Sequence, residues 1–84
     1  MKVHRFVQYV NEEGTIRKNP PSPYCLGWYK EFRLTVDMDG VRYGAAHRAV
    51  CFSLTEDNEF IQHVWRRLVR QVARTIEDQI TESL

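Results

Sequence analysis

The sequence predicts an α+β protein, in which an antiparallel sheet of three or four strands is covered on one face by one long C-terminal helix. The first observation is the dipeptide Asp39-Gly40 between two runs of strand-forming residues, which is a strong signal for a two-residue hairpin. The second is that hydrophobic residues recur at helical spacing from about residue 55, with no Gly or Pro up to Leu84. We expect residues 1–84 to form a single domain. Its predicted elements are strands over 2–10, 28–38 and 41–52 and a helix over 55–83.

The N-terminal segment KVHRFVQYV, residues 2–10, favours a strand because it is rich in Val, Phe and Tyr. A turn at NEEG follows it, and TIRK, residues 15–18, is a candidate for a short returning strand that the sequence alone does not decide. The proline cluster NPPSPY, residues 19–24, is predicted to be a rigid loop between two sheet elements.

The hairpin turn at Asp39-Gly40 also fixes which residues of the two strands lie opposite each other. One face of the hairpin then carries mainly apolar pairs, which are Met38–Val41, Val36–Tyr43, Leu34–Ala45 and Phe32–His47. The other face carries Asp37–Arg42, Thr35–Gly44, Arg33–Ala46 and Glu31–Arg48, of which the first and last are opposite-charge pairs. The small residues 44–46 indicate either a bend, bulge or close packing, or a flat site for a partner's backbone.

The helix is expected to begin with Ser53 and Glu56 in a capping box, or with Thr55 as an alternative cap. About 28 helical residues would measure ~42 Å, whereas strands of about ten residues measure ~33 Å at most. The helix should therefore extend beyond the sheet.

Two apolar stripes run along the predicted helix. The first is fit to pack on the sheet and comprises Ile61, Trp65, Leu68 and Val72. The second is rotated from it by roughly 80° and comprises Val69, Ala73, Ile76 and Ile80. A single helix on a single sheet needs only one stripe. The second is therefore covered either by the first strand or the proline loop, or by a second copy of the chain in a homodimer.

An arginine-rich face lies opposite these stripes and comprises His63, Arg66, Arg67, Arg70 and Arg74. Arg74 can reach Glu77 and Asp78, whereas the other three arginines have no carboxylate three or four residues away. This face is either a solvated surface or an anion-binding patch for phosphate or for a partner's acidic residues.

Composition and charge exclude several classes of protein. The chain is 43% hydrophobic and 27% charged, which is typical of a globular protein, and its net charge of +1 does not favour nucleic acid or membranes in general. We expect a cytoplasmic protein, because no signal peptide and no apolar run of ~20 residues is found. Cys25 and Cys51 are then expected to be reduced thiols.

The sequence shows no catalytic or metal-binding signature, so we expect a protein that is not an enzyme and has no cofactor or metal. The three histidines, His4, His47 and His63, lie in different elements without metal-ligand spacing. Cys25 has no partner that would identify it as a nucleophile. A small enzyme that uses Cys25 or a histidine is kept as the third alternative.

Residues 24–75, with a hairpin followed by a helix, resemble the strand half of a double-stranded-RNA-binding domain. That family begins with a helix, whereas this chain begins with a predicted strand. It also places basic residues at the helix N-terminus to contact phosphates, where this chain has Glu56, Asp57 and Glu59. Binding of double-stranded RNA is therefore not expected from this resemblance.

The leading hypothesis is a protein–protein interaction module, such as an adaptor, an assembly component or a phage-type inhibitor, that acts as a homodimer. It would bind an acidic or apolar protein surface through Arg66, Arg67, Arg70 and Arg74, or through Tyr24, Trp28 and Tyr29. Its oligomer seam would be Val69, Ala73, Ile76 and Ile80. The second hypothesis is a nucleic-acid-binding protein that uses the same four arginines.

Overall fold

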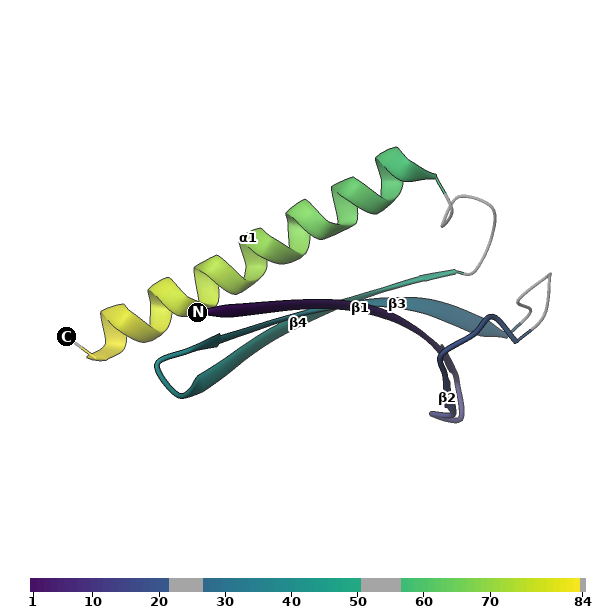
Figure 1. Cartoon of the computed structure of the whole chain (residues 1–84), viewed down its shortest axis with the longest axis horizontal. Helices are drawn as coiled ribbons and strands as arrows, with labels where there is room; N and C mark the ends of the chain where they lie inside the picture. The colour runs from purple at the N-terminus through teal and green to yellow at the C-terminus, as the bar shows by residue number, and fades with distance from the viewer. Residues whose placement is uncertain (22–26, 51–56, 84) are drawn as a thin grey trace.

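The computed structural model describes residues 1–21, 27–50 and 57–83, and it shows a four-stranded antiparallel sheet with one long helix on one face (Figure 1). The elements are β1 (Lys2–Asn11), β2 (Ile16–Arg17), β3 (Trp28–Met38), β4 (Val41–Val50) and α1 (Asn58–Ser83). The predicted α+β class is confirmed, and the strands begin at the predicted residues.

The strand order in the sheet is β2-β1-β3-β4. β1 pairs with β3 along its whole length, from Lys2 opposite Asp37 to Asn11 opposite Trp28. The returning strand that the sequence left undecided is β2, and it pairs with β1 only at Tyr9 and Val10. The remaining part of β1, residues 2–8, therefore forms one edge of the sheet.

The β3–β4 hairpin has the predicted turn and the predicted register. Asp39 and Gly40 have φ angles of 53° and 78°, as a tight two-residue turn of this kind requires. All eight predicted cross-strand pairs are present. The pairing continues without interruption through Gly44–Ala46, so these small residues form no bulge.

α1 begins at Asn58, three residues later than predicted. Asp57 is its N-cap, because the Asp57 carboxylate accepts hydrogen bonds from the backbone N–H groups of Glu59, at 2.8 Å, and Phe60, at 3.4 Å. Asp is as good a cap as Ser or Thr, which explains why the sequence offered several starts. The predicted caps Ser53 and Thr55 lie outside the described residues, as does the end of the third predicted strand.

The core lies between the helix and the apolar side of the hairpin. Its buried residues are Phe32, Leu34 and Val36 from β3 and Val64, Leu68 and Val72 from α1. Phe32 meets the ring of Trp65 edge-on, with the centroids 5.5 Å apart. Leu68 and Val72 were predicted in this role, but the helix is rotated so that Val64 is buried while Ile61 and Trp65 are only partly buried.

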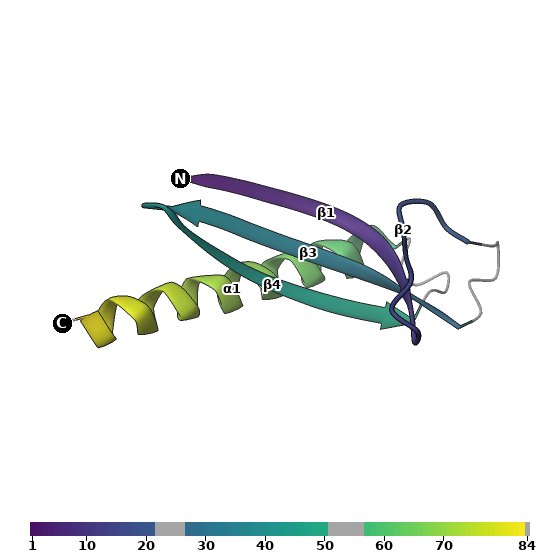
Figure 2. The same cartoon turned by 90° about the horizontal axis from the view of Figure 1, so that it is seen from below.

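α1 contacts β3 and β4 and leaves most of the corresponding side of β1 uncovered. Figure 2 shows the helix crossing the sheet obliquely, and its C-terminal turns extend beyond the β3–β4 hairpin. The expected overhang is thus present, whereas β1 does not cover the second apolar stripe of the helix.

Candidate functional site

A groove of about 430 Å³ lies between the exposed side of β1 and the N-terminal half of α1. The groove exists because α1 is centred on β3 and β4. The side chains of β1 that point to the helix side therefore lie beside α1 and not beneath it. We call it the arginine groove. Its lining residues are Arg5, Gln62, Trp65, Arg66, Val69 and Arg70.

Trp65 and Arg5 form the inner part of the arginine groove. Trp65 is partly buried and is held edge-on against the core residue Phe32. Arg5 lies opposite Leu34 in the sheet and so points to the helix side, where its guanidinium carbon is 5.6 Å from the centre of the Trp65 ring. This cation–π contact restrains the Arg5 side chain while its N–H donors stay accessible.

The arginine groove is electropositive. Three of its six lining residues are arginines and none is acidic. Within the described part of the chain, no carboxylate forms an ion pair with Arg5, Arg66 or Arg70. An anionic group entering the groove would therefore find guanidinium donors that no acidic residue of the described ranges already occupies.

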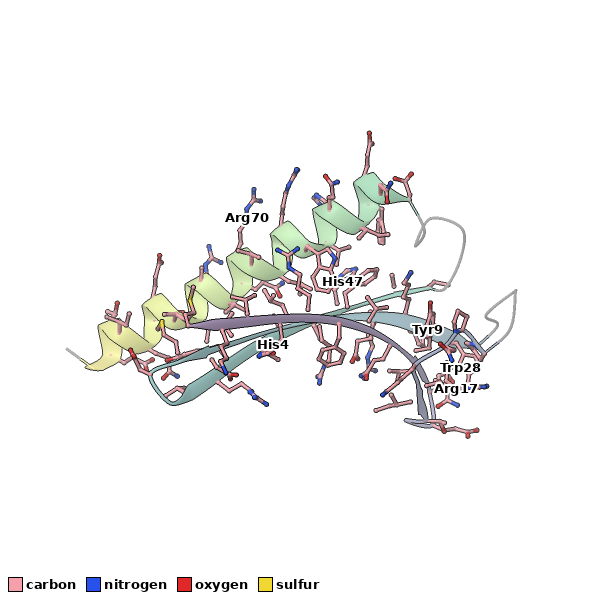
Figure 3. The ribbon with its side chains drawn as sticks, viewed as in Figure 1. His4, Tyr9, Arg17, Trp28, His47 and Arg70 are labelled. Carbon is pink, nitrogen blue, oxygen red and sulfur yellow. The ribbon has the colours of Figure 1, made fainter. Side chains whose placement is uncertain are left out.

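The structure separates the four predicted arginines into two sets. All four are exposed, but only Arg66 and Arg70 line the arginine groove, whereas Arg67 and Arg74 do not. Figure 3 shows the Arg70 side chain rising from the helix away from the sheet, which places Arg70 at the rim. Arg74 was expected to pair with Glu77 and Asp78, but no ion pair joins these three among the residues described.

Arg5 is a candidate site residue that the sequence did not reveal. The sequence contains one signal for it. In the first predicted strand, Arg5 lies on the same face as Val3 and Val7, and it is the charged residue between these two apolar ones. Its distance from the helical arginines in the sequence hid the cluster.

Trp28 and Tyr29, two residues of the predicted aromatic site Tyr24–Trp28–Tyr29, do not share one surface. Trp28 and Tyr29 are consecutive strand residues, so their side chains point to opposite faces of the sheet. Trp28 packs against the buried Tyr9, and the Arg17 guanidinium lies 6.0 Å from its ring centre (Figure 3). Tyr24 lies outside the described residues.

Only part of the predicted oligomer seam is exposed to solvent. Ile76 packs against the core, whereas Val69 and Ile80 are 43% and 53% exposed and Ala73 is also exposed. Val69 belongs to the arginine groove, so Ala73 and Ile80 remain as exposed apolar residues on the C-terminal half of the helix.

The sheet face opposite the helix carries a polar cluster around Glu31, which is 2% exposed. The Glu31 carboxylate accepts hydrogen bonds from Gln8 and Arg48, both at 2.7 Å, and forms an ion pair with Arg33 at 3.0 Å. Burial raises the pKa of Glu31, but the hydrogen bonds from Arg48 and Gln8 and the arginine charges outweigh it and lower this pKa below its ordinary value. The cluster is thus a structural ion-pair network.

On the same face, the small residues Gly44 and Ala46 leave a hollow of about 270 Å³ that Arg33 and Thr35 also line. The second cross-strand ion pair lies at the end of this face, where Arg42 Nε is 2.7 Å from Asp37 Oδ1. A hydrogen bond from Arg42 is the main cause that lowers the pKa of Asp37.

The three histidines are far from forming one site. His4 is 3.7 Å from Asp37 on the open face of the sheet, His47 lies between the sheet and the helix, and His63 is exposed on the helix (Figure 3). No cluster of three or more His, Cys, Asp or Glu that could hold a metal ion occurs in the described ranges, and Cys25 and Cys51 lie outside them. No described helix has the length and apolar character needed to span a membrane.

The chain matches no protein-family model, no curated protein and no solved structure.

Proposed function

We propose that the protein is a non-enzymatic binding module, and that the arginine groove receives an acidic segment of a partner protein. The observation that carries this proposal is that Arg5, Arg66 and Arg70 line one groove together with Trp65, and that no acidic residue is in the lining. An adaptor, an assembly component and an inhibitor all act through such a surface.

The residue types of the groove support tight and selective contact. Arg and Trp are enriched among the residues that dominate binding energy at protein interfaces. The guanidinium groups can bind carboxylates in a bidentate manner, and Trp65 and Val69 offer apolar surface beside them. Acidic side chains flanked by apolar ones would match both parts of the groove.

A protein segment fits this groove better than a nucleic acid does. The arginines are few and gathered at one hollow, whereas a nucleic acid needs positive charge spread along a path that follows its phosphates. The N-terminus of α1 carries Asp57 and Glu59, and their charges disfavour phosphate at that end of the groove.

The proposal is tested with a seven-residue acetylated peptide that alternates Val and Glu. Its affinity is measured by isothermal titration calorimetry at ~50 mM and ~200 mM salt. Binding by the natural protein, and loss of about tenfold or more in affinity in the double variant Arg66→Glu/Arg70→Glu, are expected because each lost charge-assisted contact is worth about 1.5 to 3 kcal/mol.

The matched control is the double variant Arg67→Glu/Arg74→Glu, which changes the net charge equally but lies outside the groove lining. It should lose far less affinity than the groove variant. Equal losses in the two variants would show a diffuse charge effect, and no binding by the natural protein would overturn the proposal. Stronger binding to a random single-stranded oligonucleotide at the same salt would favour the nucleic-acid alternative instead.

The proposal includes self-association. Ala73 and Ile80 lie on the part of α1 that follows the groove lining, and both are exposed. A homodimer that buries them would leave the groove open in each protomer.

A further inference from the structure

β1 is an edge strand next to the arginine groove. One side of β1 pairs with β3 over residues 2–11, but the other side pairs with β2 only at Tyr9 and Val10. Figure 2 shows β1 along the outer side of the sheet, with β2 at its C-terminal end only. Within the described part of the chain, residues 2–8 therefore have no strand neighbour on their outer side.

The backbone groups that face this outer side can be identified from the pairing of Asn11. The Asn11 N–H donates to the Thr15 carbonyl, at 3.2 Å, and the Asn11 carbonyl accepts from the Gly14 N–H, at 3.1 Å. Asn11 thus directs both backbone groups outward. Because the direction alternates along a strand, Val3, Arg5 and Val7 also direct their N–H and carbonyl groups outward.

The side chains of Val3, Arg5 and Val7 all point to the helix side of the sheet, since their pairing partners in β3 are Val36, Leu34 and Phe32. A strand that bonded to these backbone groups would place the residue opposite Arg5 on the same side. That side chain would enter the arginine groove. The backbone edge and the groove are therefore two parts of one surface.

We propose that the acidic partner segment binds as an additional strand on the outer edge of β1, with an acidic side chain opposite Arg5. This inference rests on the proposed function and specifies how the segment is held. Backbone hydrogen bonds supply affinity in such strand addition, while alternate side chains supply specificity. The side chains that point away from the groove would lie beside Phe6, which is 42% exposed, so apolar residues suit those positions.

Charge argues against a second copy of β1 as the added strand. The free part of β1 contains Lys2, His4 and Arg5 and no acidic residue. Pairing of this segment with itself would bring like charges together, which destabilises a strand pair. An acidic segment from a different protein reverses the sign of this interaction.

Amide hydrogen exchange, measured by NMR with the Val–Glu peptide, tests the inference. We expect the amides of Val3, Arg5 and Val7 to exchange at least about tenfold more slowly in the complex, because they gain hydrogen bonds. The amides of His4 and Phe6 are the internal reference, since they face β3 already.

Two variants separate backbone from side-chain effects. Val3→Pro removes one outward N–H without removing a bond to β3, and Val3→Ala removes most of the side chain but keeps the N–H. We expect the Pro variant to bind the peptide about tenfold more weakly than the Ala variant. The far-ultraviolet circular dichroism of both variants checks that they fold.

The outcomes distinguish the two proposals. Binding with slower exchange at Val3, Arg5 and Val7 supports strand addition. Binding that depends on Arg66 and Arg70 but leaves these three amides and the Pro–Ala comparison unchanged overturns strand addition and retains the proposed function. Absence of binding overturns both.

Discussion

Glu31 shows how a single buried charge is held in this small protein. Its carboxylate is buried on the face opposite the helix and is satisfied by Gln8, Arg33 and Arg48 together. When the charge is removed, the exposed arginine side chains can reorient toward solvent. The loss of stability therefore equals the contribution of the lost charge-assisted hydrogen bonds. We expect Glu31→Gln to lower the free energy of unfolding at pH 7 by about 1 to 3 kcal/mol.

This effect should depend on pH in a defined direction. Because the folded-state pKa of Glu31 lies below its ordinary value of 4.5, its stabilisation is fully present above that pH and is lost as the pH falls through the folded-state pKa. Urea unfolding from pH 7 downward should show the two proteins converging in acid. Glu13→Gln, at an exposed turn, is the control that should change little, and a difference from Glu31→Gln that stays constant below pH 4.5 would contradict the assignment.

At the residue scale, the sequence predicted Glu31–Arg48 but missed Gln8, the partner of Glu31 on β1. The difference has a physical cause. The tight turn at Asp39-Gly40 determines the β3–β4 register locally, so opposite residues can be read from it. Gln8 and Arg5 reach their places through the pairing of β1 with β3, which is set by packing across a long connection and has no local signal.

At the scale of the element, α1 combines two surfaces within one turn. Leu68 is 1% exposed and packs in the core, while its neighbour Val69 is 43% exposed and lines the arginine groove. We expect Leu68→Ala to destabilise the protein by about 2 to 5 kcal/mol, because it removes buried methyl groups and leaves a cavity.

Val69→Ala is the matched comparison on the same helix. It should change the free energy of unfolding by about 0.5 kcal/mol or less, because nearly half of the Val69 surface is already exposed to solvent. Urea unfolding measures both values. Similar losses in the two variants would mean that the helix is rotated relative to the placement described.

Helical spacing identified Leu68 and Val72 as core residues but did not fix the rotation of the helix. Hydrophobic residues cover more than half of the wheel around α1, so several rotations bury a similar apolar area. The contact of Trp65 and Phe60 with Phe32 selects the observed one, in which Val64 replaces Ile61 at the centre of the core.

At the scale of the whole molecule, the strand order and the helix placement create the candidate site. The sequence predicted the strands, the hairpin and the helix, and the structure adds the position of β1 beside β3. Arg5 lies in one groove with Arg66 and Arg70 because α1 packs over β3 and β4 and not over β1. A groove of this kind depends on how elements are offset from one another, and residue patterns within each element contain no information on that offset.

The last prediction concerns association of two whole molecules through the end of α1. Ile80 is 53% exposed and lies with Ala73 on the C-terminal half of α1. The last turns of this helix extend beyond the hairpin (Figure 1). If these residues form a homodimer seam, Ile80→Glu should shift the protein toward the monomer, because a buried carboxylate without a partner is costly. Sedimentation velocity over a wide range of concentrations measures this shift. Ile16→Glu is the matched control, since Ile16 is 59% exposed in the distant β2, and it should leave the dimer intact. A natural protein that sediments as a monomer at every concentration would contradict the seam, and the groove would then act in a single copy.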